Sequence, residues 1–530
     1  MTDKMKVLIA EKIAASGIEA LKAEFDVEVK TDLTPEQLVA EIPGYDALIV
    51  RSATKATREV IEAGVDLKII GRAGVGVDNV DVQAATERGI IVCNAPTSNI
   101  VSAAEHTVAL LMAMARNIPQ ADASMKQGKW ERSKFTGAEL YEKTLAIFGL
   151  GRIGSLVAER ARPFGVRMIG YDPYTSPEKA QAMGVELMED VDAILAQADF
   201  ITVHLPKTKE TIGMFGAEQF AKMKDGVRLV NTARGGIYRT EALAEALRSG
   251  KVAGAAIDVY EVEPCTDSPL MEFDRVILTP HLGASTEEAQ DRAGEQIAEY
   301  VAAGLRGEMV ATAVNIAPVS PEVYEKVGPF IRLAEDLGKL VAQIARGGIE
   351  GLEIKFVGGL ADTDTRILRT AVLKGMLSVV SAESVNFVNA DYYAEQRGIT
   401  VSETRRMETH DYVSLLAVHA KTPDGVVDAG ATLMGKKNEP RLVSLYGFDL
   451  DMVPSEYMSF FVYEDRPGMI GKVGTALGQH GINIAQMQVG RRTQGGSALM
   501  GINVDTPVPE DVLSTIMSEA GIEKAWSIEL

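Results

Sequence analysis

The sequence predicts an α/β protein built on open parallel sheets, with α+β units toward its C-terminus. Three observations predict this class. Short apolar runs alternate with amphipathic helical patterns in the first half of the chain, which is typical of parallel sheets covered by helices. A glycine-rich turn joins one of these runs to the helix that follows it. Residues 455–530 have the order β-α-β-β-α-β of a ferredoxin-like plait.

The first unit covers residues 1–98 and contains five short apolar runs, which are residues 6–10, 27–29, 47–50, 67–70 and 90–93. Ligands of open parallel sheets bind beyond the carboxyl ends of the strands. These ends carry Arg51 and Ser52 after one run, and Arg72 and Gly74 after another. The two arginines are either solvated strand-end charges or parts of an anion pocket, and the glycine-rich backbone beside them favours the pocket.

A dinucleotide-binding motif follows a long helical pattern over residues 99–116. The apolar run 145–148 leads into a G-x-G-x-x-G turn and an amphipathic helix, and the next apolar run ends at Asp172. This order of strand, glycine turn and helix places a pyrophosphate at the helix N-terminus. The Asp172 carboxylate is placed to bind the ribose hydroxyls and to repel a 2′-phosphate, which favours NAD over NADP. The expected cofactor contacts here are Gly149, Gly151, Arg152, Ile153, Gly154 and Asp172.

The later strands of this unit, residues 200–203, 227–230, 252–257 and 276–279, also end in polar side chains. An imidazole carries protons near neutral pH, a carboxylate fixes its tautomer, and a guanidinium binds a substrate carboxylate. Arg234, Glu263 and His281 therefore suit the oxidation of a 2-hydroxy acid, with the cofactor accepting the hydride. On sequence alone His204 competes with His281 as the proton carrier, and Glu261 competes with Glu263 as its partner.

The remaining sequence predicts the return of the chain to the first unit and two further domains. A helical pattern over 285–305 and the run 314–316 complete the first unit, so that its residues are 1–98 and 285–317, and the nucleotide unit is 99–284. Prolines at 318 and 321 mark the next boundary. Residues 318–453 have helical patterns at 322–346 and 365–378 and strands between 412 and 450, and residues 454–530 form the ferredoxin-like unit.

Composition excludes several classes of function. At 530 residues, with 46% apolar and 24% charged residues, the chain is an ordinary soluble protein of about three to four domains. Its net charge of −20 argues against nucleic acid and anionic membranes as partners. Two cysteines, Cys93 and Cys265, favour a reducing compartment, and we expect the cytoplasm. Neither a signal peptide, a membrane span nor a metal-ligand spacing is expected from the sequence.

Several motifs together resemble the D-isomer-specific 2-hydroxyacid dehydrogenase family: GLGRIG with YDP, NTARGG, the Glu-Pro of DVYEVEP, and PHLGAST. The resemblance implies a Rossmann NAD domain inserted in a flavodoxin-like substrate domain, followed by an intervening domain and an ACT domain. It assigns catalysis to Arg234, Glu263 and His281, which settles both alternatives. It further implies that the cofactor contacts His204, Leu205, Pro206, Thr232, Ala233, Asp258 and Gly283, and that the substrate contacts Arg51, Ser52, Arg72, Gly74 and Asn99.

RSATK, GRAGVGVDNVD and GKWERSKF resemble the branch of this family that oxidises 3-phospho-D-glycerate to 3-phosphohydroxypyruvate with NAD, the entry step of L-serine biosynthesis. A small anionic substrate explains a basic pocket in so acidic a chain. The alternatives are a dehydrogenase for glyoxylate, hydroxypyruvate or D-lactate, and a non-catalytic NAD-sensing protein. ACT domains often bind the end product of their pathway, so L-serine is the expected effector of a homodimer or homotetramer, with Tyr463, Asp465 and Asn483 as contacts.

Overall fold

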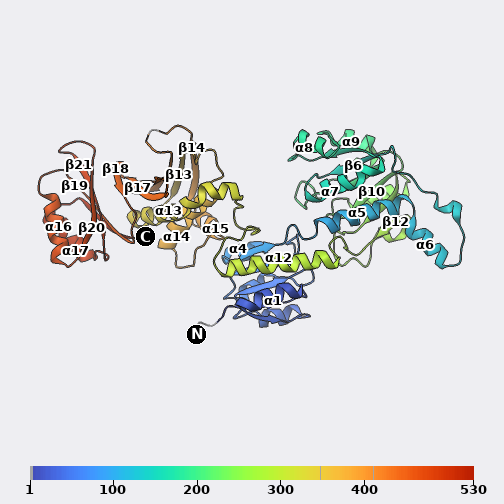
Figure 1. Ribbon diagram of the computed structural model, residues 1–530, viewed down its shortest axis with the longest axis horizontal. Helices are drawn as coiled ribbons and strands as arrows, with labels where there is room; N and C mark the ends of the chain where they lie inside the picture. The colour runs from blue at the N-terminus through green and yellow to red at the C-terminus, as the bar shows by residue number, and fades with distance from the viewer. Residues whose placement is uncertain (1–3, 347, 410) are drawn as a thin grey trace.

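The computed structural model of the protein describes residues 4–346, 348–409 and 411–530. The strands of this part of the chain form four sheets, each covered by its own helices. Figure 1 shows the four units side by side along the long axis of the molecule, with the nucleotide unit at one end and the ferredoxin-like unit at the other. None of the described helices combines the length and the apolarity that a membrane crossing requires.

The first unit is a five-stranded parallel sheet with the order β2-β1-β3-β4-β5, the strand order of flavodoxin-like folds. Its inner strands β1, β3 and β4 are largely buried on both faces, as parallel strands between helices must be, whereas the edge strand β2 is partly exposed. Helices α1 and α12 cover one face and α2, α3 and α4 the other. The elements are β1 Lys6–Ile9, α1 Ala15–Glu24, β2 Asp26–Val29, α2 Pro35–Glu41, β3 Ala47–Val50, α3 Arg58–Ala63, β4 Ile69–Arg72, α4 Val82–Glu87, β5 Ile91–Asn94 and α12 Glu287–Leu305.

The nucleotide unit is a seven-stranded parallel sheet with the doubly wound order β12-β11-β10-β9-β6-β7-β8. It confirms the predicted Rossmann fold and its strands, and it adds the short edge strand β8, which no apolar run predicts. Its elements up to β9 are α5 Ile100–Ala115, α6 Ile118–Lys126, β6 Thr144–Phe148, α7 Arg152–Ala161, β7 Arg167–Tyr171, α8 Pro177–Ala182, β8 Val185–Leu187, α9 Val191–Gln197 and β9 Phe200–Val203. The rest are α10 Ala217–Lys222, β10 Val227–Asn231, α11 Thr240–Arg248, β11 Val252–Ile257 and β12 Val276–Leu278.

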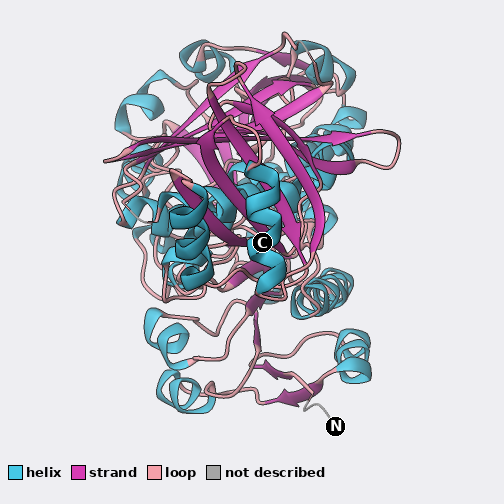
Figure 2. Cartoon of the chain, turned by 90° about the vertical axis from the view of Figure 1, so that its left-hand side faces the viewer, coloured by secondary structure: helices cyan, strands magenta, loops and turns pink. Residues whose placement is uncertain are grey.

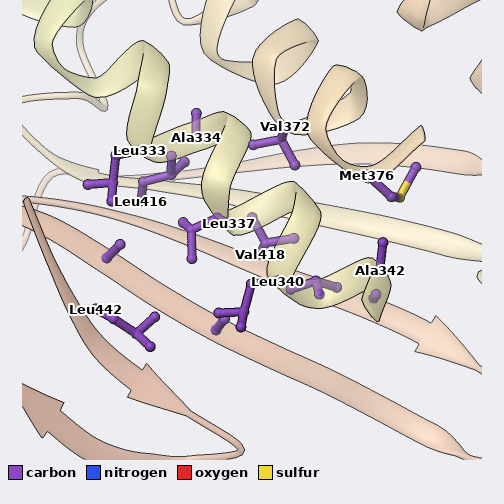
Figure 3. Packing of buried hydrophobic residues seen from close by; sticks show 14 of the residues in the cluster. Leu333, Ala334, Leu337, Leu340, Ala342, Val372, Met376, Leu416, Val418 and Leu442 are labelled. Atoms are coloured by element: carbon purple, nitrogen blue, oxygen red, sulfur yellow. The ribbon is translucent and has the colours of Figure 1, made fainter. Parts of the chain in front are cut away.

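The third unit packs two long helices against a six-stranded sheet. Figure 3 shows Leu333, Leu337 and Leu340 of α13 pointing onto the strands beneath. The helices α13 and α14 pack in close contact at Gly338 and Gly375, where a Cβ atom would collide with the backbone of the opposite helix. The elements are α13 Pro321–Ala345, β13 Gly351–Gly358, α14 Arg366–Val380, α15 Ala390–Gln396, β14 Thr400–Arg406, β15 Ser414–Thr422, β16 Gly425–Met434, β17 Glu439–Leu445 and β18 Phe448–Met452.

The fourth unit has the strand order β20-β21-β19-β22 and confirms the ferredoxin-like plait. Alternate residues of β19 serve two cores: Phe460 faces the third unit, and Phe461 faces the helices α16 and α17. Figure 2 views the molecule from this end, with the first unit at the bottom. The elements are β19 Tyr457–Glu464, α16 Met469–Gln479, β20 Ile484–Arg491, β21 Ser497–Val504, α17 Glu510–Ala520 and β22 Lys524–Glu529.

Side-chain hydrogen bonds join the third unit to both of its neighbours, and the run 314–316 differs from a regular strand. The Asn386 amide donates to the Gly89 carbonyl of the first unit (2.7 Å). The Gln343 amide bonds both backbone groups of Glu529 in the fourth unit. Residues 314–316 form no strand; only a single bridge, Cys93 to Ala313, extends the first sheet there. The four domain boundaries stay predictions.

Candidate active site

A cavity of about 250 Å³ lies where the carboxyl ends of the first two parallel sheets face each other. The first unit contributes the turn after β4, and the nucleotide unit contributes the loops after β9, β10, β11 and β12. All three residues predicted to be catalytic line this cavity. Its walls are Arg72, Val75, Gly76, Asp78, Asn99, Lys207, Arg234, Gly235, Val259, Tyr260, Glu261, Glu263, His281 and Ala284.

The Glu263 and His281 side chains form a hydrogen-bonded pair on the cavity wall. Glu263 Oε2 lies 2.7 Å from His281 Nδ1, and Glu263 Oε1 accepts the backbone N–H of Tyr260 (2.9 Å). Burial raises the pKa of the Glu263 carboxyl, but the bonds from His281 and Tyr260 outweigh it, so that the net pKa lies below the ordinary value of 4.5. The carboxylate is therefore ionised through the neutral range, and the pairing of Nδ1 leaves His281 Nε2 to exchange a proton.

The turn that carries His281 is anchored to Asp258. His281 has a positive φ of 54°, and its N–H donates to the Asp258 carbonyl (2.9 Å). The Asp258 carboxylate accepts the N–H groups of Leu282 (2.7 Å) and Gly283 (2.9 Å). A left-handed backbone is rare for residues other than glycine, and it persists where the surroundings fix it. These bonds supply that constraint.

The loop after β10 aims Arg234 into the cavity. The buried amide of Asn231 donates to the Arg234 carbonyl (2.9 Å) and accepts the Ala233 N–H (3.0 Å). The Arg234 guanidinium donates to the Ala233 carbonyl (2.7 Å), and its Nε lies 3.7 Å from the Asp78 carboxylate of the first unit. Arg234 thus faces the first unit across the cavity, with donors left for a bound carboxylate.

The geometry distinguishes the two candidates for the proton-carrying histidine and the two candidates for its carboxylate partner. Glu261 Oε1 accepts the N–H and the hydroxyl of Thr240 (3.0 and 2.7 Å), so it caps α11 and does not pair with a histidine. His204 Nε2 lies 3.0 Å from the Thr202 hydroxyl, and burial lowers the pKa of His204 to about 4. A histidine that stays neutral at physiological pH suits packing beneath the glycine turn better than proton transfer.

The glycine turn has the shape that a dinucleotide requires. Gly149 has a φ of 93°, and a Cβ there would lie 2.6 Å from the His204 carbonyl. A Cβ at Gly154 would collide with the Gly149 carbonyl, whereas Gly151 borders open space at the N-terminus of α7. The open backbone at Gly151 and the free N–H groups of the first helical turn fit a pyrophosphate. Arg152 and Ile153 begin the same helix, and the Arg152 guanidinium donates to the Pro96 carbonyl (3.2 Å).

Asp172 follows β7 and lies beside this turn. Its carboxylate accepts the N–H groups of Leu150 (2.7 Å) and Tyr174 (2.8 Å), one on each oxygen. Each carboxylate oxygen has a further lone pair, so the group still accepts ribose hydroxyls. Leu205 and Pro206 follow β9 at the same edge of the sheet, with Thr232 and Ala233 after β10.

Replacing Asp172 with Ala is expected to weaken NAD binding about tenfold or more and to narrow the preference over NADP. The substitution removes a charge-assisted hydrogen bond to the ribose and a repulsive charge together. Fluorescence titration of NADH and NADPH measures both dissociation constants. A general disturbance of the turn would weaken both cofactors alike and leave the ratio of the two constants unchanged. A wild-type protein that prefers NADPH would contradict the role given to Asp172.

The predicted substrate residues divide into two groups. Arg72 and Asn99 line the cavity, whereas Arg51, Ser52 and Gly74 lie outside its wall. Burial and the positive charge of Arg234 lower the pKa of Arg72 to about 10. In the described part of the chain, Arg72 Nε and Asn99 Oδ1 are buried without a hydrogen-bond partner. The Asp78 and Glu11 carboxylates favour the charged form of Arg72, but its Nε donor is free among the described residues, and an anionic ligand could accept from it.

The residues of the second group support the wall from behind. The Glu11 carboxylate accepts the N–H groups of Arg51 (2.7 Å) and Thr54 (2.9 Å), and the Arg51 guanidinium donates to the Lys12 carbonyl (3.1 Å). A Cβ at Gly74 would collide with the Arg72 guanidinium, so the glycine makes room for Arg72.

The sequence did not single out three polar residues of the cavity wall, Asp78, Lys207 and Tyr260. Lys207 directly follows the expected cofactor contact Pro206, and Asp78 follows the glycine-rich turn after β4, so their positions after strand ends were available signals. Tyr260 carries no such signal. No group of three or more metal-ligating side chains occurs within residues 4–346, 348–409 and 411–530.

The expected effector residues lie in the fourth unit but do not meet within one chain. Asp465 follows β19 and accepts a bond from Arg491 (3.2 Å), whereas Asn483 precedes β20 and donates to Asp505 (2.8 Å). Both strands run antiparallel to β21, so these two residues lie at opposite ends of the sheet. Tyr463 is buried in the core beneath α16 and α17.

Family models match three stretches of the chain. Residues 108–283 match the D-isomer specific 2-hydroxyacid dehydrogenase NAD-binding domain, residues 326–446 the D-3-phosphoglycerate dehydrogenase intervening domain, and residues 459–521 the ACT domain. The fold and the site therefore define a dehydrogenase of the D-2-hydroxyacid class that binds NAD. The third unit is an intervening domain and the fourth an ACT domain, as the resemblance predicted.

Solved structures of NAD-dependent dehydrogenases match more than half of the chain. A D-lactate dehydrogenase from Aquifex aeolicus, in complex with NAD and lactic acid, is 29% identical with a TM-score of 0.52, covering 57% of this chain and 96% of that one. An NAD-dependent formate dehydrogenase from Staphylococcus aureus, in complex with NAD, is 33% identical with a TM-score of 0.52, covering 57% and 97%.

Curated relatives match along the whole chain. The D-3-phosphoglycerate dehydrogenase of Synechocystis sp. is 46% identical over 526 residues, which cover 99% of this chain and 95% of the relative. That of Methanocaldococcus jannaschii is 44% identical over 526 residues, covering 99% and 100%. The chain therefore belongs to the family of the D-3-phosphoglycerate dehydrogenases.

Proposed function

We propose that this protein oxidises 3-phospho-D-glycerate to 3-phosphohydroxypyruvate with NAD, as the first step of L-serine biosynthesis in the cytoplasm. The observation that carries the proposal is the hydrogen-bonded Glu263–His281 pair beside Arg234, in the cavity between the nucleotide unit and the first unit. The identity of 44–46% with D-3-phosphoglycerate dehydrogenases over nearly the whole chain supports it.

The residues of the cavity have distinct tasks in this reaction. The Arg234 guanidinium binds the substrate carboxylate and orients the adjacent carbon that bears the hydroxyl. His281 Nε2 takes the hydroxyl proton, and Glu263 stabilises the imidazolium that results. Bound NAD supplies the hydride acceptor for the hydrogen on that carbon. In the reverse direction the imidazolium returns its proton to the forming hydroxyl.

The electrostatics around Arg72 support a phosphorylated substrate. Arg72 is half-buried with its Nε fully buried, its pKa is lowered by burial and by Arg234, and Arg51 adds a further positive charge nearby. A dianionic phosphate placed against these groups would offset their mutual repulsion, whereas an unphosphorylated acid occupies only the carboxylate position at Arg234.

Replacing Arg51 with Ala is expected to raise KM for 3-phospho-D-glycerate by about tenfold while leaving KM for unphosphorylated D-glycerate within about twofold, because a positive charge behind the Arg72 wall of the cavity is lost. Arg72→Ala is the matched variant from the cavity wall and is expected to have the larger effect. Initial rates with both substrates measure the two constants. Equal changes for both substrates would remove Arg51 from the phosphate site.

The direct test of the proposed function is an NADH-linked assay against a panel of acids. We expect turnover of 3-phospho-D-glycerate to exceed that of D-glycerate and D-lactate and, in reverse, reduction of 3-phosphohydroxypyruvate to exceed that of hydroxypyruvate and glyoxylate. Preference for an unphosphorylated acid would make the protein another D-2-hydroxyacid dehydrogenase. NAD binding without turnover of any acid would make it a sensor.

L-serine is the proposed effector of the ACT domain in a homodimer or homotetramer. Asp465 and Asn483 lie at opposite ends of one sheet, so a site that uses both needs Asn483 from a second copy. A carboxylate suits the ammonium group of an amino acid, and an amide suits its carboxylate. Tyr463 lies two residues before Asp465 in the chain and is buried in the core of the ACT domain.

L-serine is expected to inhibit the wild-type enzyme and to lose at least tenfold in potency against Asp465→Ala and Asn483→Ala. Coupling between separate sites is typically about 1–3 kcal/mol, so uninhibited rates should stay near the wild-type value. Initial rates during a titration with L-serine, with D-serine as the control, measure this. Equal inhibition of all three proteins, or of none, would contradict the proposed site.

A further inference from the structure

Helix α5 lies behind the three loops that carry the catalytic side chains, which follow β10, β11 and β12. It begins at Ile100, directly after the chain leaves the first unit, and it packs against β10, β11 and β12. Three polar side chains, Ser102, His106 and Thr107, point from it toward these strands. Ser102 and His106 are four residues apart and share one face of the helix, and Thr107 lies beside them. The three side chains therefore form one polar stripe.

Each member of the stripe bonds to a loop of the active site. The Ser102 hydroxyl donates to the Gly283 carbonyl in the His281 turn (2.8 Å). The Thr107 and Thr232 hydroxyls, both buried, lie 2.6 Å apart at the start of the Arg234 loop. His106 Nε2 lies 3.3 Å from Asp258 Oδ1 and 3.4 Å from the Thr279 hydroxyl.

Asp258 joins His106 to the catalytic turn. Its carboxylate is completely buried and has four neighbouring donors: the Thr279 hydroxyl (2.6 Å), the N–H groups of Leu282 and Gly283, and His106. Because the Thr279 hydroxyl donates its hydrogen to Asp258, its oxygen accepts from His106. Nε2 of His106 therefore carries the hydrogen that faces this cluster.

We infer that His106, assisted by Ser102 and Thr107, is a positioning residue for the Glu263–His281 pair and acts through Asp258. This inference rests on the proposed function, because the stripe is taken to serve the proton transfer by His281. His106 itself touches neither reacting atom; it fixes the carboxylate that holds the N–H groups on the far side of His281.

The energetics favour His106 as the main member of the stripe. A buried carboxylate is costly unless donors surround it, and bonds to a charged group are stronger than neutral ones. Burial raises the pKa of Asp258, but the bonds from His106, Thr279 and Leu282 outweigh it and leave the pKa below the ordinary value. Removal of the His106 donor destabilises the buried Asp258 carboxylate. It thereby weakens the hydrogen bonds by which this carboxylate fixes the turn.

The test compares His106→Leu with His106→Gln, whose amide places a donor where Nε2 stands. Glu105→Gln is the matched control, because Glu105 is the adjacent residue of α5 and pairs instead with Arg160 of α7 (3.5 Å). We expect His106→Leu to lower kcat by about ten- to a hundredfold, since small displacements of a catalytic group have effects of this size. KM and the NADH dissociation constant should stay within about twofold, and His106→Gln should recover most of kcat.

Hydrogen exchange of the Leu282 and Gly283 amides, followed by mass spectrometry of the peptide spanning them, reads the turn directly and needs no substrate. We expect faster exchange in His106→Leu and wild-type exchange in His106→Gln and Glu105→Gln. Unchanged kcat with unchanged exchange in His106→Leu would overturn the inference, and so would a His106→Gln variant as impaired as His106→Leu. Absence of turnover in the wild type would refute the proposed function, while the exchange result would still decide whether His106 anchors the turn.

Discussion

Replacement of His281 with Ala is expected to lower kcat for 3-phospho-D-glycerate oxidation by about 10²–10⁴-fold, the usual contribution of a positioned general base. His281 is the histidine that the structure pairs with a carboxylate on the cavity wall, through the 2.7 Å bond to Glu263. The NADH dissociation constant should change little, because the imidazole acts on the substrate hydroxyl. Stopped-flow measurement of NADH formation in a single turnover separates this chemical step from product release.

Two further variants make the result specific to His281. His480→Ala is the matched control, because His480 ends an ACT-domain helix and bonds only locally, to the Ala476 carbonyl (2.8 Å). It should leave kcat at the wild-type value. Glu263→Gln should lose part of the rate, since an amide partner stabilises an imidazolium less well than a carboxylate. Near-normal turnover in His281→Ala would move proton transfer to another group, with His204 the first to examine.

Replacement of Arg234 with Ala is expected to lower kcat/KM by about 10²–10³-fold, the cost of removing a donor aimed at the reacting group. Arg234→Lys should recover only a small part, because an ammonium keeps the charge but lacks the planar fork that binds a carboxylate with two hydrogen bonds. Initial rates over a range of 3-phospho-D-glycerate concentrations measure this, with NADH titration as the check on cofactor binding.

Arg239→Ala is the matched control for Arg234. Arg239 is exposed, precedes α11 and packs beside Gly213, outside the cavity wall. Its removal should leave kcat/KM within about twofold. If Arg234→Ala retains wild-type kcat/KM, the substrate carboxylate binds elsewhere in the cavity, and Arg72 and Lys207 are the remaining cations on its wall.

The strands and helices of the catalytic units follow from local sequence patterns. Apolar runs such as residues 145–148 and 252–257 predict buried strands because parallel strands are apolar on both faces. The glycine turn after Phe148 is recognisable because Gly149 and Gly154 stand where a Cβ atom would collide with backbone, and Gly151 leaves the helix N-terminus open to a ligand. The strands β13 and β14 of the third unit escaped prediction. Alternating and exposed strands carry a weaker local signal than continuous apolar runs, and these two acquire their partners only in the sheet.

The catalytic site was only partly determined by the sequence. Motif spacing places Glu261 and Glu263 at almost the same point of the chain, and the resemblance to known dehydrogenases chose between them. The tertiary structure supplies the physical reason: Glu261 caps α11, and Glu263 meets an imidazole from a different loop. Likewise His204 and His281 both follow strands. The fold buries His204 beneath the glycine turn, and this burial lowers the pKa of His204.

The polar stripe on α5 was determined by the tertiary structure alone. In the sequence, Ser102, His106 and Thr107 are polar residues of a mostly apolar helix, and nothing local predicts their partners on the active-site loops. Their bonds reach residues between 125 and 181 positions away, on loops that follow three different strands. Sequence patterns fix local conformation because neighbouring residues determine it. Contacts across such distances exist only once the sheet has aligned the carboxyl ends of its strands at one edge.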